Sequence, residues 1–437
     1  MRFHSTRSDF DTDVTGAIMA GLAPDGGLLI PEQLPRLALS SLDGLSTPAE
    51  LGPVVLAPLF EGSALAGELA DICRDALDFP MPVRAVPGEK GLFVLELFHG
   101  PTAAFKDVGA RFLAACMEKI LAAEPADPRG PLVILVATSG DTGGAVAAAF
   151  HRRAGIRVVV LFPEGQVSQR QQHQLTCWGD NVLSLAVQGS FDACQALVKA
   201  AFTDATLAAR VRLSSANSIN VGRLMPQTLY YAAAALEHFR ATGRKPNFIV
   251  PTGNLGNALA CNWARAMGLP IGEIVFATNA NRTIPDYLAT GNWQPRPSVN
   301  TLASAMDVGD PSNMERLTAL YGEFDELRRA VSAYPVGDEE IVAQIKADYA
   351  KGGQIWCPHT ATAAWVYAHL PPAKRGGDWI LVATAHPAKF EATVEPAIGA
   401  TIPIPATLQA ILDLPSDFQT IPAEFAALEK YIYKIVA

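Results

Sequence analysis

The feature that most constrains this fold is a regular alternation of continuous apolar runs with segments that are predicted to be helical. Three β-rich runs carry hydrophobic residues on both faces, at Leu132 to Ala137, Val158 to Phe162 and Val182 to Val187. Strands of this kind are buried on both sides, which is typical of parallel sheets with helical crossover connections. Helices are expected between and after them, over residues 143–150, 168–178 and 191–202. The sequence therefore predicts parallel βαβ units.

A second series of the same kind begins near Asn247. Its predicted strands are Phe248 to Pro251, Ile274 to Ala277 and Trp379 to Ala383, with a helix over residues 258–267. Between residues 281 and 350 the sequence is more polar and interrupted by proline, which predicts a peripheral segment or a lid. We therefore expect an α/β fold with two doubly wound lobes of mainly parallel strands, and a ligand site in the cleft between them.

The chain is long enough for several domains, because 437 residues exceed the size at which a single hydrophobic core stops growing. Residues 1–95 carry no nucleotide-binding loop pattern and are predicted to form a helical N-terminal domain. We assign residues 96–245 to the first lobe, and residues 246–437, with the C-terminal segment, to the second.

Charge and hydropathy argue against several classes of function. The formal net charge of −9 repels nucleic-acid phosphates and anionic lipids, so neither partner is expected. No run approaches the roughly 18–20 apolar residues that span a bilayer, and the N-terminus lacks the apolar stretch of a secretory signal. The six cysteines are scattered without a C-x-x-C pair, so we expect neither a disulfide framework nor a metal site. A cytoplasmic enzyme is the simplest interpretation.

A polar stretch follows the first predicted strand. It consists of the small or polar residues Thr138-Ser139-Gly140-Asp141-Thr142-Gly143, so the backbone can approach a ligand closely. Its N–H groups would converge at the start of the next helix, where an anionic group is favoured. A tight turn with a helix cap accounts for the same residues without a ligand, so the stretch alone does not decide between the two.

A second loop follows the strand that ends at Pro251. Its sequence is Gly253-Asn254-Leu255-Gly256-Asn257, and because glycine and asparagine tolerate positive φ, successive amides can point at one anion. The loop matches neither the G-x-G-x-x-G dinucleotide pattern nor the G-x-x-x-x-G-K-[ST] nucleotide pattern. It therefore predicts a cradle for a phosphate that belongs to neither NAD nor ATP, with an ordinary Asn-Gly turn as the alternative.

Lys106 lies in an apolar stretch, Phe98 to Asp107, where the chain enters a predicted helix. A desolvated lysine near the positive end of a helix dipole has its ammonium form disfavoured, which lowers its pKa. Such a lysine can act as a nucleophile and form a Schiff base. Because most lysines are solvated surface cations, the residues around Lys106 permit this role without requiring it.

Taken together, these stretches resemble the threonine synthases, which are fold-type II pyridoxal 5'-phosphate (PLP) enzymes, in their longer form with an extra N-terminal domain. The most specific matches are HGPT-x-AFKD at residues 99–107, TSGDTG at residues 138–143 and TAHPAKF at residues 384–390. Further matches are Ser5-Thr6-Arg7, Asp25-Gly26-Gly27-Leu28, Asn217 to Arg223, Pro251 to Asn257 and Met306-Asp307-Val308. They occur in order from residue 5 to residue 390, so the resemblance covers nearly the whole chain.

The resemblance implies a PLP site. Lys106 matches the lysine that forms the Schiff base, and the loop from Gly253 to Asn257 matches the cradle for the cofactor phosphate. Thr384 matches the hydroxyl residue beside the pyridine nitrogen, which cannot protonate that nitrogen as a carboxylic acid would. Asp141 matches the position beside the ring hydroxyl, where shorter members of the family carry Asn.

The resemblance also implies a substrate site. It matches Ser139 and Thr142 to the carboxylate and backbone of the amino-acid substrate, and to its phosphate Ser218, Asn220 and Arg223, with Lys389 as a second candidate cation. The guanidinium of Arg223 suits this position because it can bind two phosphate oxygens at once. An ordinary surface ion pair is the alternative for both Arg223 and Lys389.

The implied reaction converts O-phosphohomoserine and water to L-threonine and phosphate. The amine of Lys106 removes the α-proton and moves a proton at Cβ, so that phosphate leaves from Cγ and water adds at Cβ. Two alternatives remain open. A phospholyase with the same early chemistry would release 2-oxobutyrate, and an inactive relative would bind the metabolite without turnover. The protein is expected to be a monomer or a homodimer, and the sequence does not decide which.

Overall fold

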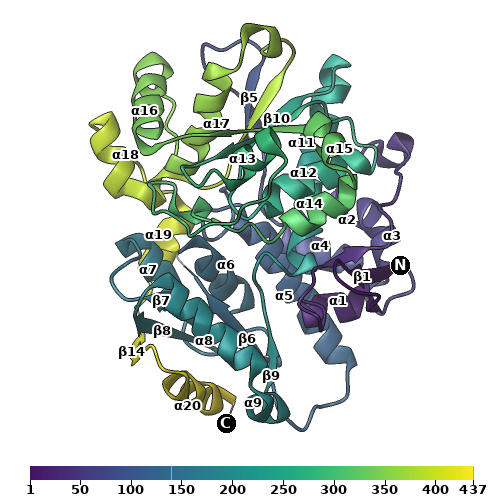
Figure 1. Cartoon of the computed structure of the whole chain (residues 1–437), viewed down its shortest axis with the longest axis vertical. Helices are drawn as coiled ribbons and strands as arrows, with labels where there is room; N and C mark the ends of the chain where they lie inside the picture. Colours follow the sequence, from purple (N-terminus) through teal and green to yellow (C-terminus); the bar gives the residue numbers. More distant parts are fainter. Residues whose placement is uncertain (139, 437) are drawn as a thin grey trace.

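The structure, a computed structural model, describes residues 1–138 and 140–436. It has a small N-terminal domain beside two larger lobes, which follow one another along the long axis of the molecule (Figure 1). Each larger lobe is built on one mainly parallel sheet. The predicted α/β fold with two mainly parallel lobes is confirmed.

The N-terminal domain combines short helices with a small sheet. Its antiparallel strands, in the order β2-β1-β3, are β1 (Arg2–Ser5), β2 (Asp11–Asp13) and β3 (Leu29–Pro31). Its helical elements are α1 (Val14–Ala20), η1 (Leu39–Leu42), α2 (Pro48–Val55), α3 (Ala57–Phe60) and α4 (Leu69–Ala76). The helices agree with the prediction. The sheet is an addition to it, because strands of three or four residues are too short to show an apolar-polar alternation.

The larger of the two lobe sheets has six strands. In spatial order these are β12 (Val331–Pro335), β11 (Ile274–Thr278), β10 (Asn247–Pro251), β13 (Trp379–Ala383), β5 (Leu92–Glu96) and β4 (Val83–Ala85), and β4 alone is antiparallel to its neighbour. Successive residues of β10 enter different hydrophobic clusters. Phe248 packs in the cluster that holds α12 (Gly256–Ala266), whereas Ile249 packs in the cluster that holds α17 (Pro358–His369). The sheet is therefore buried on both faces, as its apolar runs predict.

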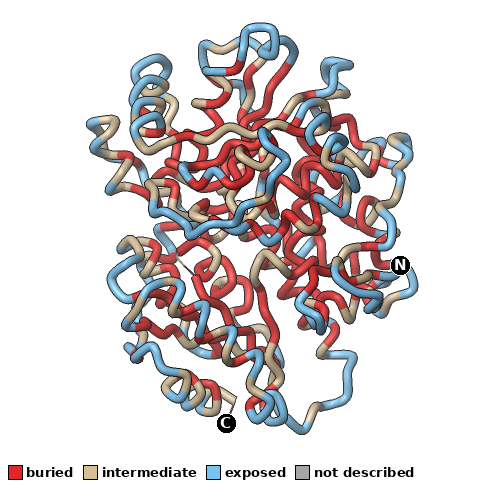
Figure 2. The backbone as a smooth tube through the Cα atoms, viewed as in Figure 1, coloured by how far each residue is buried: buried red, intermediate tan, exposed pale blue. Residues whose placement is uncertain are grey.

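The other lobe has a five-stranded sheet that is entirely parallel. Its strands, in spatial order, are β14 (Gln419–Pro422), β8 (Val182–Gln188), β7 (Ile156–Pro163), β6 (Leu132–Ala137) and β9 (Arg212–Ser214). Ile134 packs in the cluster with α5 (Lys106–Ala123) and α6 (Asp141–Phe150), and Leu135 in the cluster with α8 (Phe191–Thr203) and α20 (Phe425–Val436). Figure 2 shows this buried backbone in both lobes, with the exposed segments at the periphery.

The remaining helices cover these sheets or connect them. They are α7 (Gln169–Thr176), α9 (Ala205–Arg210), α10 (Val221–Leu224), α11 (Gln227–Thr242), α13 (Thr283–Thr290), η2 (Ser304–Met306), α14 (Met314–Tyr321), α15 (Phe324–Ala330), α16 (Asp338–Gly352), η3 (Pro372–Lys374), η4 (Pro387–Phe390), α18 (Glu391–Ile398) and α19 (Ala406–Leu412). Within the described ranges, none of the helices combines the length and the apolar character that a membrane crossing needs.

The sheets do not follow the division into residues 1–95, 96–245 and 246–437. Strands β4 and β5 belong to the sheet of the second lobe, and β14, near the C-terminus, belongs to the sheet of the first. The chain thus crosses between the lobes more often than a division in sequence order allows. The pairing of strands far apart in sequence leaves no signal in local hydrophobic patterns, which explains the difference.

The region from residue 281 to residue 350 is also less peripheral than predicted. Its strand β12 forms the edge of the six-stranded sheet beside β11, and its short helix η2 lines the cavity described below. The polar composition suits an edge strand, since four of the five residues of β12 are only partly buried.

Candidate active site

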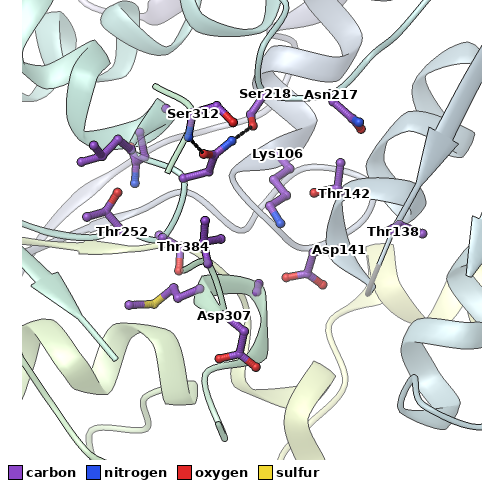
Figure 3. Close-up of a pocket in the computed structure, with 18 of the residues that line it drawn as sticks. Lys106, Thr138, Asp141, Thr142, Asn217, Ser218, Thr252, Asp307, Ser312 and Thr384 are labelled. Atoms are coloured by element: carbon purple, nitrogen blue, oxygen red, sulfur yellow. Dashed lines mark hydrogen bonds between the residues drawn. The ribbon is translucent and has the colours of Figure 1, made fainter. Parts of the chain in front are cut away.

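A cavity of about 400 Å³ is lined by residues that directly follow β6, β10 and β13. Thr138, Thr252 and Thr384 each come immediately after one of these strands. The carboxyl ends of parallel strands are where ligands bind in α/β folds. Figure 3 shows these three residues around the cavity, with the side chain of Lys106 pointing into it.

Lys106 is the first residue of α5 and lines this cavity. Burial, opposed by the charge of Asp141 and assisted by the nearby cations Arg223 and Lys389, lowers the pKa of Lys106 to about 8. Part of this amine is therefore neutral near neutral pH, as a nucleophile or general base requires. The predicted lowering of its pKa is confirmed.

The loop from Gly253 to Asn257 lines the cavity and leads into α12. Among the described residues, the N–H groups of Asn254, Leu255 and Gly256 have no hydrogen-bond acceptor. Leu255 has a φ of 62°, in the left-handed region, which turns successive amides toward the start of the helix. A Cβ at Gly253 would lie 2.7 Å from the Cα of Met306, so only glycine fits there. These free amides at a helix N-terminus suit a phosphate.

Asn257 adds a side chain to this cradle. Its Oδ1 accepts hydrogen bonds from the hydroxyls of Tyr230 and Tyr231, at 2.6 and 2.7 Å. Those two bonds fix the orientation of the amide, so Nδ2 faces away from the two tyrosines. Nδ2 is buried and has no partner among the described residues. A buried donor without an acceptor is costly, so this amide is prepared for an acceptor that a ligand brings.

The residues that follow β6 form a tight turn into α6. Thr138 Oγ1 accepts from the N–H groups of Gly140 and Gly143, at 3.0 and 2.9 Å. Gly140 has a φ of 146°, which a residue with a side chain rarely adopts. Asp141 and Thr142 line the cavity, as predicted for ligand-contacting residues. The predicted substrate residue Ser139 lies outside the described residues.

Asp141 and Lys389 form a buried ion pair, in which the Lys389 ammonium lies 2.8 Å from Asp141 Oδ1. Burial raises the pKa of Asp141, but the charges of Lys389 and Lys106 outweigh it, so the pKa is lowered and the carboxylate is ionised. Lys389 also donates to the carbonyl of Thr102 at 2.8 Å, and its side chain is fully buried without lining the cavity. The partners of Lys389 here both lie within the protein, and its predicted role as a phosphate-binding cation stays a prediction.

Two of the three residues predicted around the substrate phosphate reach the cavity. Ser218 and Arg223 line it, and the Arg223 guanidinium donates to the carbonyl of Ala216 at 2.5 Å and of Lys106 at 3.5 Å. Burial lowers the pKa of Arg223 to about 10, which leaves it cationic near neutral pH. Gly109 makes room for it, since a Cβ there would lie 2.9 Å from Arg223 Nε.

Asn220 has a structural role in this fold, and its predicted contact with the substrate stays a prediction. Its Oδ1 accepts from the N–H of Gly222 at 2.9 Å and caps α10. Its amide donates to the carbonyls of Ile18 and Ser215, at 2.9 and 3.2 Å, so both ends of the side chain are occupied. The residue is fully buried and does not line the cavity.

Several residues that line the cavity are absent from the predicted set. Asn217 has a buried Oδ1 without a partner among the described residues, and Asp307 and Thr252 lie near the phosphate loop. Asn217 and Asp307 belong to stretches that match the family, so that signal was available. His359 had no such signal. Its Nε2 accepts from the N–H of Ala305 at 3.1 Å, and burial lowers its pKa to about 4, so the ring is neutral.

Comparison with known proteins identifies the family. A profile of the family described as pyridoxal-phosphate dependent enzymes matches residues 80–385. Profiles of the N terminus and of the C-terminal part of threonine synthase match residues 2–77 and 360–432. The threonine synthase of Haemophilus influenzae is 40% identical to the chain over 96% of both sequences, and that of Escherichia coli is 38% identical over 95% of both. The chain belongs to the threonine synthase family.

Solved structures of this family agree with the fold. The crystal structure of threonine synthase from Escherichia coli covers 99% of this chain and 100% of its own, with a TM-score of 0.89 at 36% identity. The structure of PLP-bound threonine synthase from Brucella melitensis covers 100% and 99%, with a TM-score of 0.91 at 34% identity. The threonine synthase resemblance, with its N-terminal domain and fold-type II architecture, is thereby confirmed.

Proposed function

We propose that this protein converts O-phosphohomoserine and water to L-threonine and phosphate, with PLP bound in the cavity at Lys106. The observation that carries this proposal is the meeting of three features in one cavity of a threonine synthase family member. They are an amine with a lowered pKa, a cradle of main-chain amides without acceptors among the described residues, and a buried arginine. A phosphorylated amino acid and a phosphorylated aldehyde cofactor together require all three.

The residues of this cavity fit the cofactor. The amides of the Gly253 to Asn257 loop would hold its phosphate, Lys106 would bind its aldehyde carbon, and Thr384 would lie beside the ring nitrogen. Asp141, ionised by its pairing with Lys389, would lie beside the ring hydroxyl. When bound, PLP supplies the electron sink that stabilises negative charge developing at Cα of the substrate.

The side chains of this cavity account for the remaining steps. The neutral amine of Lys106 takes the proton from Cα and then a proton from Cβ, and after phosphate has left a proton is returned to Cγ. The Arg223 guanidinium and the Ser218 hydroxyl hold the substrate phosphate while it leaves from Cγ. Thr142, which lines the cavity, is proposed to bind the substrate carboxylate, and Ser139 is proposed for the same group by the family match alone. Water then adds at Cβ to give threonine.

The product decides between this reaction and its alternatives. The purified protein should convert O-phosphohomoserine chiefly to threonine, with equimolar release of phosphate, when both products are measured in one incubation. Dominant 2-oxobutyrate would identify a phospholyase, because that outcome omits only the addition of water. Binding of the substrate without either product would identify an inactive relative.

The rate of cofactor uptake should rise with pH through about 8, because only the neutral amine of Lys106 attacks an aldehyde. Cofactor-free protein is mixed with PLP at a series of pH values, and the absorbance of the bound cofactor is followed in time. Asp141 raises the pKa of Lys106, so Asp141→Asn should move the midpoint of this profile to lower pH. A profile that is flat between pH 6.5 and 9, or a midpoint that moves upward, contradicts the proposed environment of Lys106.

The partners and location of the protein are also proposals. We propose a monomer or homodimer in the cytoplasm that acts on a small molecule and binds neither nucleic acid nor membrane. The net charge of −9 supports the proposal that neither nucleic acid nor membrane is bound, since it disfavours anionic polymers and lipid surfaces.

A further inference from the structure

Arg316 on α14 is a buried cation that the proposed reaction does not use. Its side chain is only 1% exposed, and it makes no ion pair among the described residues. Burial lowers its pKa to about 9, although the neighbouring Glu315 opposes the shift. A buried guanidinium is costly to desolvate, so its hydrogen bonds must account for its presence here.

Those hydrogen bonds join three separate segments. Nη2 donates to the carbonyl of Leu29 in β3 at 2.9 Å and to the carbonyl of Ile219 at 2.7 Å. Nε donates to the carbonyl of Leu29 at 3.2 Å, and Nη1 donates to Asn313 Oδ1 at 2.8 Å. Arg316 therefore ties the N-terminal sheet to the segment around Ile219, which lies between the cavity residues Ser218 and Arg223.

Asn313 carries this connection to the cavity. Because Arg316 fixes its Oδ1, its Nδ2 points the other way and donates to the carbonyls of Asn254 and Ser218, at 2.9 and 3.3 Å. The side chain of Asn254 makes two further bonds. Its Nδ2 donates to Ser218 Oγ at 2.8 Å, and its Oδ1 accepts from the N–H of Ser312 at 2.6 Å. Figure 3 shows both of these bonds at the edge of the cavity. The Ser218–Asn254 pair thus joins the proposed cofactor cradle to the proposed substrate-phosphate segment.

The N-terminal domain reaches α14 by a second route. Thr6 Oγ1 donates to Glu315 Oε2 at 2.7 Å and accepts from the N–H of Leu28 at 2.9 Å. Arg7 forms an ion pair with the same Glu315 carboxylate. Thr6 therefore links the stretch around Leu28 to α14, although neither of these N-terminal stretches lines the main cavity.

We propose that the N-terminal domain positions the Ser218–Asn254 pair, with Arg316 as the positioning residue and Asn313 as the link. The proposal rests on the proposed function, in which that pair lies where the two phosphates bind. Amide donors bind an anion well only when their directions are fixed in advance. Arg316 orients Asn313, and Asn313 holds the carbonyls of Asn254 and Ser218. The extra domain of this family would then serve the site through one buried side chain.

The test compares two aldehydes that differ only in a phosphate. The full-length variant Arg316→Met, which keeps much of the apolar volume, is freed of cofactor and titrated with PLP and with pyridoxal. Its affinity for PLP should fall about tenfold or more, the effect of losing positioned hydrogen bonds, whereas its affinity for pyridoxal should change little. The KM for O-phosphohomoserine should rise by a larger factor than kcat falls.

Arg265→Met is the matched control. Arg265 is less completely buried than Arg316 and also donates to main-chain carbonyls, those of Gly272 and Ala330, but it bonds neither Asn313 nor the Ser218–Asn254 pair. This variant should keep the wild-type preference for PLP over pyridoxal. The proposal is overturned if Arg316→Met also keeps that preference, or if Arg265→Met loses it to the same extent, because either result assigns Arg316 to general stability.

A milder variant keeps the test decisive if Arg316→Met fails to fold. Thr6→Val keeps the shape of the side chain and removes its bonds to Glu315 and Leu28, so its preference for PLP should fall by about two- to fivefold. An unchanged preference in Thr6→Val would then overturn the proposal. The outcome is independent of the product assay on the wild-type protein, so a failure of the proposed function and a failure of this inference are distinguishable.

Discussion

Replacing Lys106 with alanine should lower the rate of threonine formation by at least about 10²–10⁴-fold, the range that a positioned general base contributes. The amine is the only lysine nitrogen that reaches the cavity among the described residues, and its lowered pKa leaves it partly neutral. Without it, the protons at Cα and Cβ have no positioned base, and the aldehyde of the cofactor has no covalent partner. The loss should therefore appear in two independent measurements.

The first measurement is turnover of O-phosphohomoserine, and the second is fixation of the cofactor by borohydride. Borohydride should attach PLP irreversibly to the wild-type protein and leave Lys106→Ala unmodified after denaturation. Lys119→Ala is the matched control, since Lys119 lies on the same helix α5 but pairs with Glu68 on the surface. Covalent cofactor in Lys106→Ala, or none in the wild-type protein, would show that another residue carries the cofactor.

The sheets of this protein were predictable because their strands are buried on both faces. Strands β6 and β13 begin and end at the predicted residues, since each is a continuous apolar run between polar or glycine-containing turns. The strands of the N-terminal sheet are too short for such a signal. Which strands pair across the two lobes was not predictable either, because β5 pairs with β13 and β14 pairs with β8, and both partners are far away in sequence.

Some residues of the candidate site were predictable from the sequence, and others were not. The phosphate loop and Lys106 were predictable, because each depends on main-chain geometry or on burial that the flanking residues already indicate. The internal partners of Asn220 and Lys389, by contrast, were not predictable. A motif places a residue near a site. The direction of its side chain depends on its position within a helical turn and on contacts with segments that are distant in sequence. His359 reaches the cavity from α17 and has no motif at all.

The buried pair of Asp141 and Lys389 leads to the second large effect. Lys389→Met should lower the free energy of unfolding by about 3–5 kcal/mol at pH 7.5, the usual consequence of removing one partner of a buried ion pair. Asp141 would keep its charge without its nearest cation, and the carbonyl of Thr102 would lose a donor. Urea unfolding of the cofactor-free protein measures this change. By contrast, Lys119→Met breaks a surface pair and should change stability by no more than about 1 kcal/mol.

The loss of stability in Lys389→Met should depend on pH in a defined direction. In the wild-type protein the pKa of Asp141 is lowered, so the pair contributes stability above the unfolded-state pKa and loses it as pH falls. In Lys389→Met, burial acts on Asp141 with less opposition and raises its folded-state pKa. The folded variant then binds a proton more readily than the unfolded chain does. Its deficit relative to wild type should therefore shrink as pH falls from 7.5 toward 5.

A double variant separates the charge from the packing. Lys389→Met combined with Asp141→Asn removes the uncompensated carboxylate and keeps its shape, so it should regain most of the stability that Lys389→Met loses. The Asn amide can still accept from Gln171 Nε2, which now donates to Asp141 Oδ1 at 3.1 Å. If the double variant is no more stable than Lys389→Met at pH 7.5, the loss comes from packing, and Lys389 is not needed to keep Asp141 ionised. If the double variant recovers stability, the loss in Lys389→Met comes from the uncompensated charge of Asp141. A neutral side chain at position 141 then needs no buried lysine beside it, so the two residues must change together.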